Sequence, residues 1–114
     1  MPHQMSQQMH ECIENCTNCH NICIETAAHC LQMGGKHAEA SHIRTLLDCA
    51  DICATSASFM LRGSDFHKQT CGLCAEVCEQ CATSCEQIDP NDEQMRACAE
   101  MCRRCAQSCR AMAA

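Results

Sequence analysis

Sixteen of the 114 residues are cysteine, and most of them recur at alternating steps of four and three residues. The motif C-x3-C-x2-C-x3-C occurs three times, over residues 12–23, 74–85 and 98–109. Residues with this spacing lie on one face of an α-helix and normally fill the centre of a helix bundle. Thiolates are soft metal ligands, so the pattern favours metal binding. The candidate ligands are Cys12, Cys16, Cys19, Cys23, Cys30, Cys49, Cys53, Cys71, Cys74, Cys78, Cys81, Cys85, Cys98, Cys102, Cys105 and Cys109.

A disulfide framework is the first alternative, because a high cysteine content in a short chain often indicates one. Side chains four residues apart on a helix have Cβ atoms about 5–6 Å apart, whereas a disulfide requires about 3.5–4.5 Å. The spacing therefore argues against disulfides within a helix. Cysteine as inert core filler is the second alternative, and it suits one or two buried thiols better than sixteen.

The kind of metal follows less directly from the residues. Cu(I) fits best because it selects thiolate and thioether ligands, and one Cu⁺ per thiolate leaves the core neutral. Met33, Met95 and His42 extend the cysteine spacing and are further candidate ligands. A zinc or cadmium scavenger stays open, because facing pairs of cysteines also suit a closed tetrahedral site. An iron–sulfur cluster is disfavoured, because the chain has no C-x2-C-x2-C run.

A thiol redox protein is a further alternative, because C-x2-C pairs such as Cys16/Cys19 and Cys78/Cys81 resemble redox motifs. These pairs fall in the middle of predicted helices and lack the strand context that such motifs require. No cysteine stands out as a nucleophile with a paired base. The pattern therefore predicts a protein that is not an enzyme.

The elements that position the thiols follow from the same spacing, extended to its flanking residues. It predicts four helices, over residues 5–33, 42–60, 67–88 and 95–112. We expect glycines 34, 35 and 63 to end the first two helices, Ser64 or Asp65 to cap the third, and Asp89 to cap a fourth that begins at Pro90. Short connections make neighbouring helices antiparallel. The prediction is an all-α, up-down-up-down four-helix bundle with a cysteine-lined core, and a single domain over residues 1–114.

Charge and hydropathy exclude two classes of partner. The net charge is −6 and the eight basic residues form no run, so nucleic-acid binding has no electrostatic support. No stretch of about 18 apolar residues predicts a membrane span. The first eight residues lack the basic and apolar regions of a secretory signal, so we expect a cytoplasmic protein with reduced thiols.

The chain resembles the bacterial copper storage proteins, small four-helix bundles whose lumen is lined with cysteines. The resemblance rests on the repeated C-x3-C-x2-C-x3-C motif, on the segment Cys49-Ala50-Asp51-Ile52-Cys53, and on the C-terminal segment over residues 109–114. It implies storage of multiple Cu(I) ions per chain, a cytosolic location and a homotetramer. It also implies histidines between the third and fourth helices, and residues 87–92 contain none.

The two ends of the predicted bundle carry different residues. One collects Met33, His37, His42, Asp89 and Met95, and the other collects Met5, Met9, Met60, His67 and Met112. We predict that Cu(I) enters at the end that holds Met33, His42 and Met95, from a copper chaperone or glutathione. We expect His3, His10, His20 and His29 to be solvated, and Leu31, Ile43, Leu47 and Met101 to lie on the outer surface.

Overall fold

The computed structural model describes residues 5–114, and within them the chain forms four α-helices and one short 3-10 helix. The elements are α1 (Gln7–Met33), η1 (Gly35–Ala38), α2 (Ala40–Leu61), α3 (His67–Ile88) and α4 (Glu93–Ala113). No strand occurs in this part of the chain. The prediction of an all-α fold is confirmed, and η1 is an addition to it. His3, expected to be solvated, lies outside the described residues.

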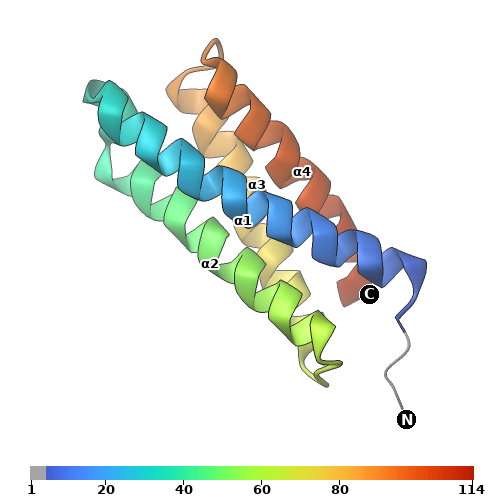
Figure 1. Ribbon diagram of the computed structural model, residues 1–114. Helices are drawn as coiled ribbons and strands as arrows, with labels where there is room; N and C mark the ends of the chain where they lie inside the picture. Colours follow the sequence, from blue (N-terminus) through green and yellow to red (C-terminus); the bar gives the residue numbers. More distant parts are fainter. Residues whose placement is uncertain (1–4) are drawn as a thin grey trace.

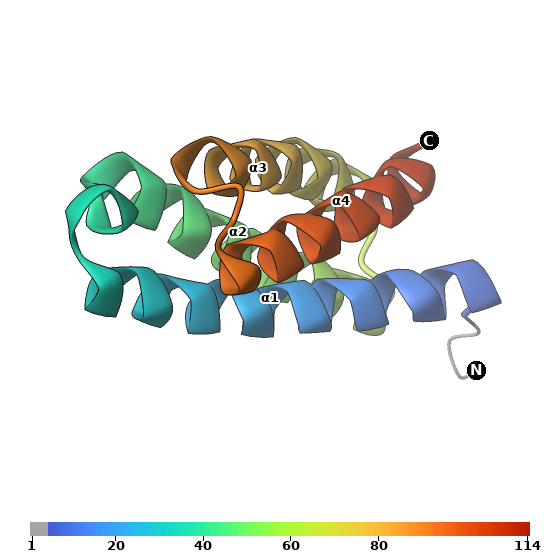
Figure 2. The same cartoon turned by 90° about the horizontal axis from the view of Figure 1, so that it is seen from above.

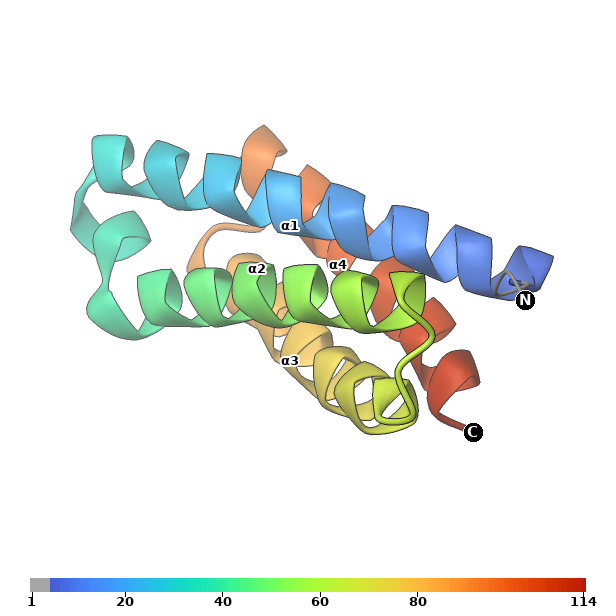
Figure 3. The ribbon, with the colours of Figure 1, turned by 60° about the horizontal axis from the view of Figure 1, so that its bottom comes forward.

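The helices pack in chain order around a square, and α4 returns to contact α1 (Figures 1 and 2). The first turn of α1 and the C-terminus lie at the same end of the bundle (Figure 3), so the predicted up-down-up-down arrangement is confirmed. The bundle is elongated, with extents of 52 × 17 × 17 Å. None of the described helices combines the length and apolar character of a membrane span.

The two ends of the bundle differ in the residues they hold. The polar end holds η1 and the connection between α3 and α4, with His37, His42 and Asp89. The methionine end holds the start of α1, the connection between α2 and α3, and the end of α4, with Met60 and Met112.

Two helix ends follow the predicted chemistry. Gly34 has a φ of 72° and its N–H donates to the carbonyl of Cys30 at 3.1 Å, which ends α1. Gly63, which follows the C-cap residue Arg62 of α2, has a φ of 65°. Both φ values lie in the left-handed region, where glycine carries no Cβ penalty.

Two predicted caps were wrong. The carboxylate of Asp89 accepts the N–H of Asn91 at 3.1 Å and so closes a turn, which moves the start of α4 past Pro90. Asp92 becomes the N-cap and accepts the N–H of Met95 at 2.9 Å. Residue 66 stands at the N-cap of α3 without a side-chain cap, while Ser64 Oγ accepts the N–H of Phe66 at 3.1 Å.

The core contains few large side chains. Between the cysteines it is filled by buried alanines such as Ala50 and Ala82, which let the helices approach closely. The residues predicted to line the core from the second helix are all buried: His42, Leu46, Cys49, Cys53, Ser56 and Met60. Met101, expected outside, is only 9% exposed, so the core is slightly wider on α4 than the cysteine spacing predicts.

Candidate metal centre

The cysteines of all four helices line one central lumen. All sixteen are free thiols, and none is more than 1% exposed. The alternating four- and three-residue steps keep each helix's cysteines on its inner face, because these steps average close to the 3.6 residues of a helical turn. The lumen is therefore a continuous column of sulfur sealed from solvent.

Fourteen of these thiols are covered by five of the groups in which all sulfur atoms lie within 4.8 Å of one another. From the methionine end, the groups are Cys12/Cys71/Cys109, Cys16/Cys74/Cys105/Cys109, Cys19/Cys53/Cys78/Cys105, Cys19/Cys23/Cys49/Cys102 and Cys23/Cys81/Cys98/Cys102. Successive groups share members, so the candidate sites overlap. Cys30 and Cys85, which are not members of these five groups, lie at the polar end.

The closest sulfur–sulfur contacts run between helices. Cys16 and Cys109 lie 3.4 Å apart and Cys53 and Cys74 lie 3.6 Å apart. Of the sulfur pairs within 4.0 Å, only Cys74/Cys78, at 3.8 Å, lies on one helix. These separations exceed the roughly 2.05 Å of a disulfide bond and leave room for an ion between two sulfurs. The donor set, thiols without carboxylates, fits a soft ion.

His42 is the buried nitrogen donor of the lumen. Its Nε2 lies 3.5 Å from Cys30 Sγ, and its Nδ1 lies 2.7 Å from Ser84 Oγ. Burial lowers the pKa of His42, which favours the neutral imidazole that binds metals. Burial, together with nearby negative charges, raises the pKa of Cys30 to about 11. The metal-free pair is therefore uncharged near neutral pH.

The two predicted thioether ligands are placed differently. Met95 is fully buried at the polar end. Met33 is 55% exposed, because it is the last residue of α1 and Gly34 turns the chain away from the lumen. The cysteine spacing predicted that Met33 lies on the inner face, and this prediction was wrong because the helix ends at that residue.

Sequence reasoning missed two histidine–carboxylate pairs at the polar end. His37 Nε2 lies 3.1 Å from Asp89, and His29 Nε2 lies 2.8 Å from Asp92. The connection between α3 and α4 contains no histidine, yet histidines from α1 and η1 reach it. The two aspartates of that connection were the available signal, but their partners lie more than fifty residues away in the chain.

The remaining histidines mostly lie away from the lumen. Expected to be solvated, His10 is exposed, but His20 and His29 are half-buried. His20 Nδ1 lies 2.9 Å from the Ala50 carbonyl. His67, at the methionine end, lies 2.9 Å from the Ser64 carbonyl through Nδ1.

A family model described as "Copper storage protein" matches residues 5–114. A solved protein from Nitrosospira multiformis is 48% identical, with a TM-score of 0.89, and the match covers 96% of this chain and 97% of that one. The Cu(I)-bound copper storage protein BsCsp3 from Bacillus subtilis is 40% identical over 95% of this chain and 100% of that one, with a TM-score of 0.87. A cytosolic copper storage protein from Streptomyces lividans, with five coppers, is 32% identical over 94% and 92%, with a TM-score of 0.81.

Proposed function

This chain belongs to the copper storage protein family, and we propose that it binds and stores many Cu(I) ions through the thiolates of its lumen. The observation that carries the proposal is the column of sixteen buried thiols, whose sulfur atoms form overlapping groups along the bundle. The helices hold the sulfurs in place before metal arrives, so binding orders few side chains. Each thiol that becomes a copper ligand releases one proton, and burial then shields the stored ion from water and competing thiols.

We propose the sixteen cysteines, His42 and Met95 as ligands of stored copper. His42 and Met95 are buried beside the thiols of the polar end. Met33 is more than half exposed, so we do not propose it as a ligand of stored copper. Cu(I) titration of Met33→Leu should leave the capacity unchanged.

Anaerobic titration of the reduced protein with Cu(I), against a competing chelator, tests the function. We expect saturation at many ions per chain, with proton release during loading and weaker loading at low pH. Saturation at one or two ions would contradict storage.

Two other functions are separated from storage by simple measurements. A zinc or cadmium scavenger would keep Zn(II) when Cu(I) is added, whereas we expect Cu(I) to displace Zn(II) almost completely. A redox enzyme would reduce insulin disulfides faster than free thiols do. We propose storage and detoxification without turnover, so this protein should show no such rate.

We further propose a cytoplasmic protein of one domain that assembles as a homotetramer and exchanges copper with a chaperone or glutathione. The solved Streptomyces relative is described as cytosolic. Exposed apolar side chains, such as Leu31 at 59% and Leu47 at 41%, support assembly. Native mass spectrometry of the metal-free and loaded protein tests the tetramer, and one cooperative unfolding transition of the metal-free protein would support the single domain.

A further inference from the structure

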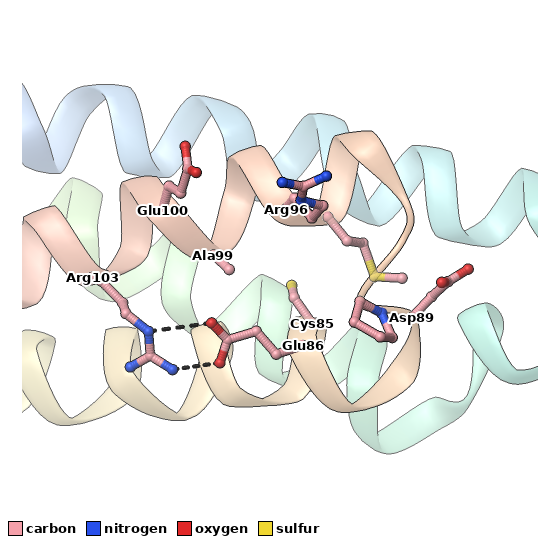
Figure 4. Close-up of a pocket in the computed structure, with 9 residues that line it drawn as sticks. Cys85, Glu86, Asp89, Arg96, Ala99, Glu100 and Arg103 are labelled. Carbon is pink, nitrogen blue, oxygen red and sulfur yellow. Dashed lines mark hydrogen bonds and ion pairs between the residues drawn. The ribbon is translucent and has the colours of Figure 1, made fainter.

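A pocket of about 220 Å³ opens between α3 and α4 near the polar end (Figure 4). Cys85 and Met95 line it, and both are otherwise buried. Ala99 and Pro90 also line it, and their small side chains leave the space open. Four other hollows of the described surface are lined without any sulfur. The floor of this pocket therefore lies against two buried sulfur-bearing residues of the lumen.

The end of the bundle beside this pocket is closed along its axis. The His37–Asp89 and His29–Asp92 pairs join η1 and α1 to the connection between α3 and α4. His37 is itself only 8% exposed. An ion that arrived along the axis would meet these pairs, whereas one that arrived through the pocket would meet the thin floor above Cys85 and Met95.

The rim of the pocket carries both signs of charge. Arg103 is committed to Glu86, through two hydrogen bonds (Figure 4), and also to Glu79 at 3.0 Å. Arg96 and Glu100 also line the pocket, and among the described residues neither takes part in an ion pair. The uncommitted charges are thus one guanidinium and one carboxylate on α4, beside the sulfur atoms.

We propose that this pocket is a lateral port, where a zwitterionic low-molecular-weight thiol delivers Cu(I) to Cys85 and Met95. The proposal rests on the proposed function. The carboxylate of the donor meets Arg96 and its ammonium group meets Glu100, while its copper-bearing sulfur faces the floor. The volume suits a molecule of that class and excludes a folded protein domain.

The transfer is a ligand exchange without a change of oxidation state. A Cu–S bond to the donor breaks, a Cu–S bond to Cys85 forms, and the Cys85 proton passes to the released donor thiolate. The thioether of Met95 supplies a second, neutral ligand. Cys81 lies one helical turn before Cys85 on α3, and it belongs to the tetrad nearest the polar end, Cys23/Cys81/Cys98/Cys102. The ion can therefore move inward by successive exchanges.

A substitution at the rim of the pocket tests the proposal and leaves the buried core unchanged. Arg96→Glu should slow loading from Cu(I)–glutathione by about fivefold, as the loss of one exposed ion pair implies. Loading should be followed anaerobically by stopped-flow absorbance of the copper–thiolate bands. Arg44→Glu makes the same charge change on exposed α2 and should load at the wild-type rate. Loading from a Cu(I)–acetonitrile complex, which carries no carboxylate, should be the same in all three proteins.

Substitution of the two sulfur-bearing residues at the floor of the pocket gives a second test of the proposed port. Cys85→Ser/Met95→Leu should slow loading by at least about tenfold, equivalent to roughly 1.4 kcal/mol of transition-state stabilisation. Cys71→Ser/Met60→Leu makes matched changes at the methionine end and should lose similar capacity with a smaller loss of rate. Far-UV circular dichroism should confirm that both variants are folded.

Two results would overturn the port. One is an unchanged loading rate in both the Arg96 and the Cys85/Met95 variants. The other is a larger loss of rate in the methionine-end variant. In either case the wild type would still bind many ions, so copper storage would stand. Wild-type saturation at one or two ions would instead remove the proposed function itself.

Discussion

The polar end and the methionine end of the bundle are closed by different kinds of contact. At the polar end the contacts are directional: His29–Asp92 at 2.8 Å, His37–Asp89 at 3.1 Å and Cys30–His42 at 3.5 Å. At the methionine end Met60 is fully buried, and Met9 and Met112 pack against the core from its edge. The column of thiols therefore ends in polar, hydrogen-bonded contacts on one side and in packed methionine side chains on the other.

The two kinds of contact contribute differently to the stability of the fold. Burial of an apolar side chain stabilises the fold in proportion to the area removed from water, and no ligand can replace it. A partly exposed histidine–carboxylate pair contributes little to stability. The methionine end should therefore hold the bundle together, while the pairs of the polar end can rearrange at small cost.

Truncating Met60 should have the largest effect on stability. Met60→Ala leaves a cavity at the methionine end and should lower the free energy of unfolding by about 2–5 kcal/mol. Met33→Ala, at an exposed position, should change it by less than about 0.5 kcal/mol. Guanidinium unfolding of the reduced, metal-free protein measures both. A greater cost for His37→Ala than for Met60→Ala would reverse the comparison.

Thr26 and Ser56 stand at positions of the cysteine spacing that lack a cysteine. Removing their hydroxyl groups should change the free energy of unfolding in opposite directions. Ser56 Oγ is buried without a hydrogen-bond partner, so Ser56→Ala should raise the free energy of unfolding by about 1 kcal/mol. Thr26 Oγ1 accepts a hydrogen bond from Gln94 at 2.9 Å, so Thr26→Val should lower it by about 1 kcal/mol. Thermal unfolding of the two variants provides the measurement, and a destabilised Ser56→Ala would show that its hydroxyl is bonded.

Alkaline pH should weaken the metal-free polar end. The pKa of Cys30 is raised by burial from the ordinary 9.0 to about 11, so its contribution is complete below pH 9. It is lost as pH rises through about 11, at no more than about 1.4 kcal/mol per pH unit for one thiol. Unfolding of wild type and Cys30→Ala between pH 7 and 11 should show the wild type losing stability faster. Parallel curves would contradict the raised pKa.

Asp92→Asn should have a small effect on stability, because Asn is as good an N-cap as Asp. The substitution then removes mainly the pair with His29, and should cost less than about 1 kcal/mol near neutral pH. Burial acts to raise the pKa of Asp92, but hydrogen bonds from His29 and the Met95 N–H hold it below its usual value. Its contribution is therefore present above the ordinary carboxyl pKa and disappears as pH falls. Urea unfolding at pH 7 and pH 3 should show the two proteins converging in acid.

The sequence predicted the inside of this molecule better than its ends. Helical spacing alone determines which face a residue occupies, and every cysteine, with His42 and Met60, lies where that spacing places it. Caps and ion pairs depend instead on which distant residues come together. Asp89 was predicted to cap α4, but it bonds Asn91 and His37, and Met33 leaves the inner face where its helix ends. Neither outcome follows from local spacing.

The sharing of thiols between neighbouring groups makes the lumen a cooperative system. Cys19, Cys23, Cys102, Cys105 and Cys109 each belong to at least two groups, so an ion held as we propose in one group would change the ligands left for the next. Sites of this kind do not fill independently, and a partly filled lumen redistributes its ions as each new one arrives. Occupancy then sets the affinity for the next ion, which gives the protein a graded response to copper supply.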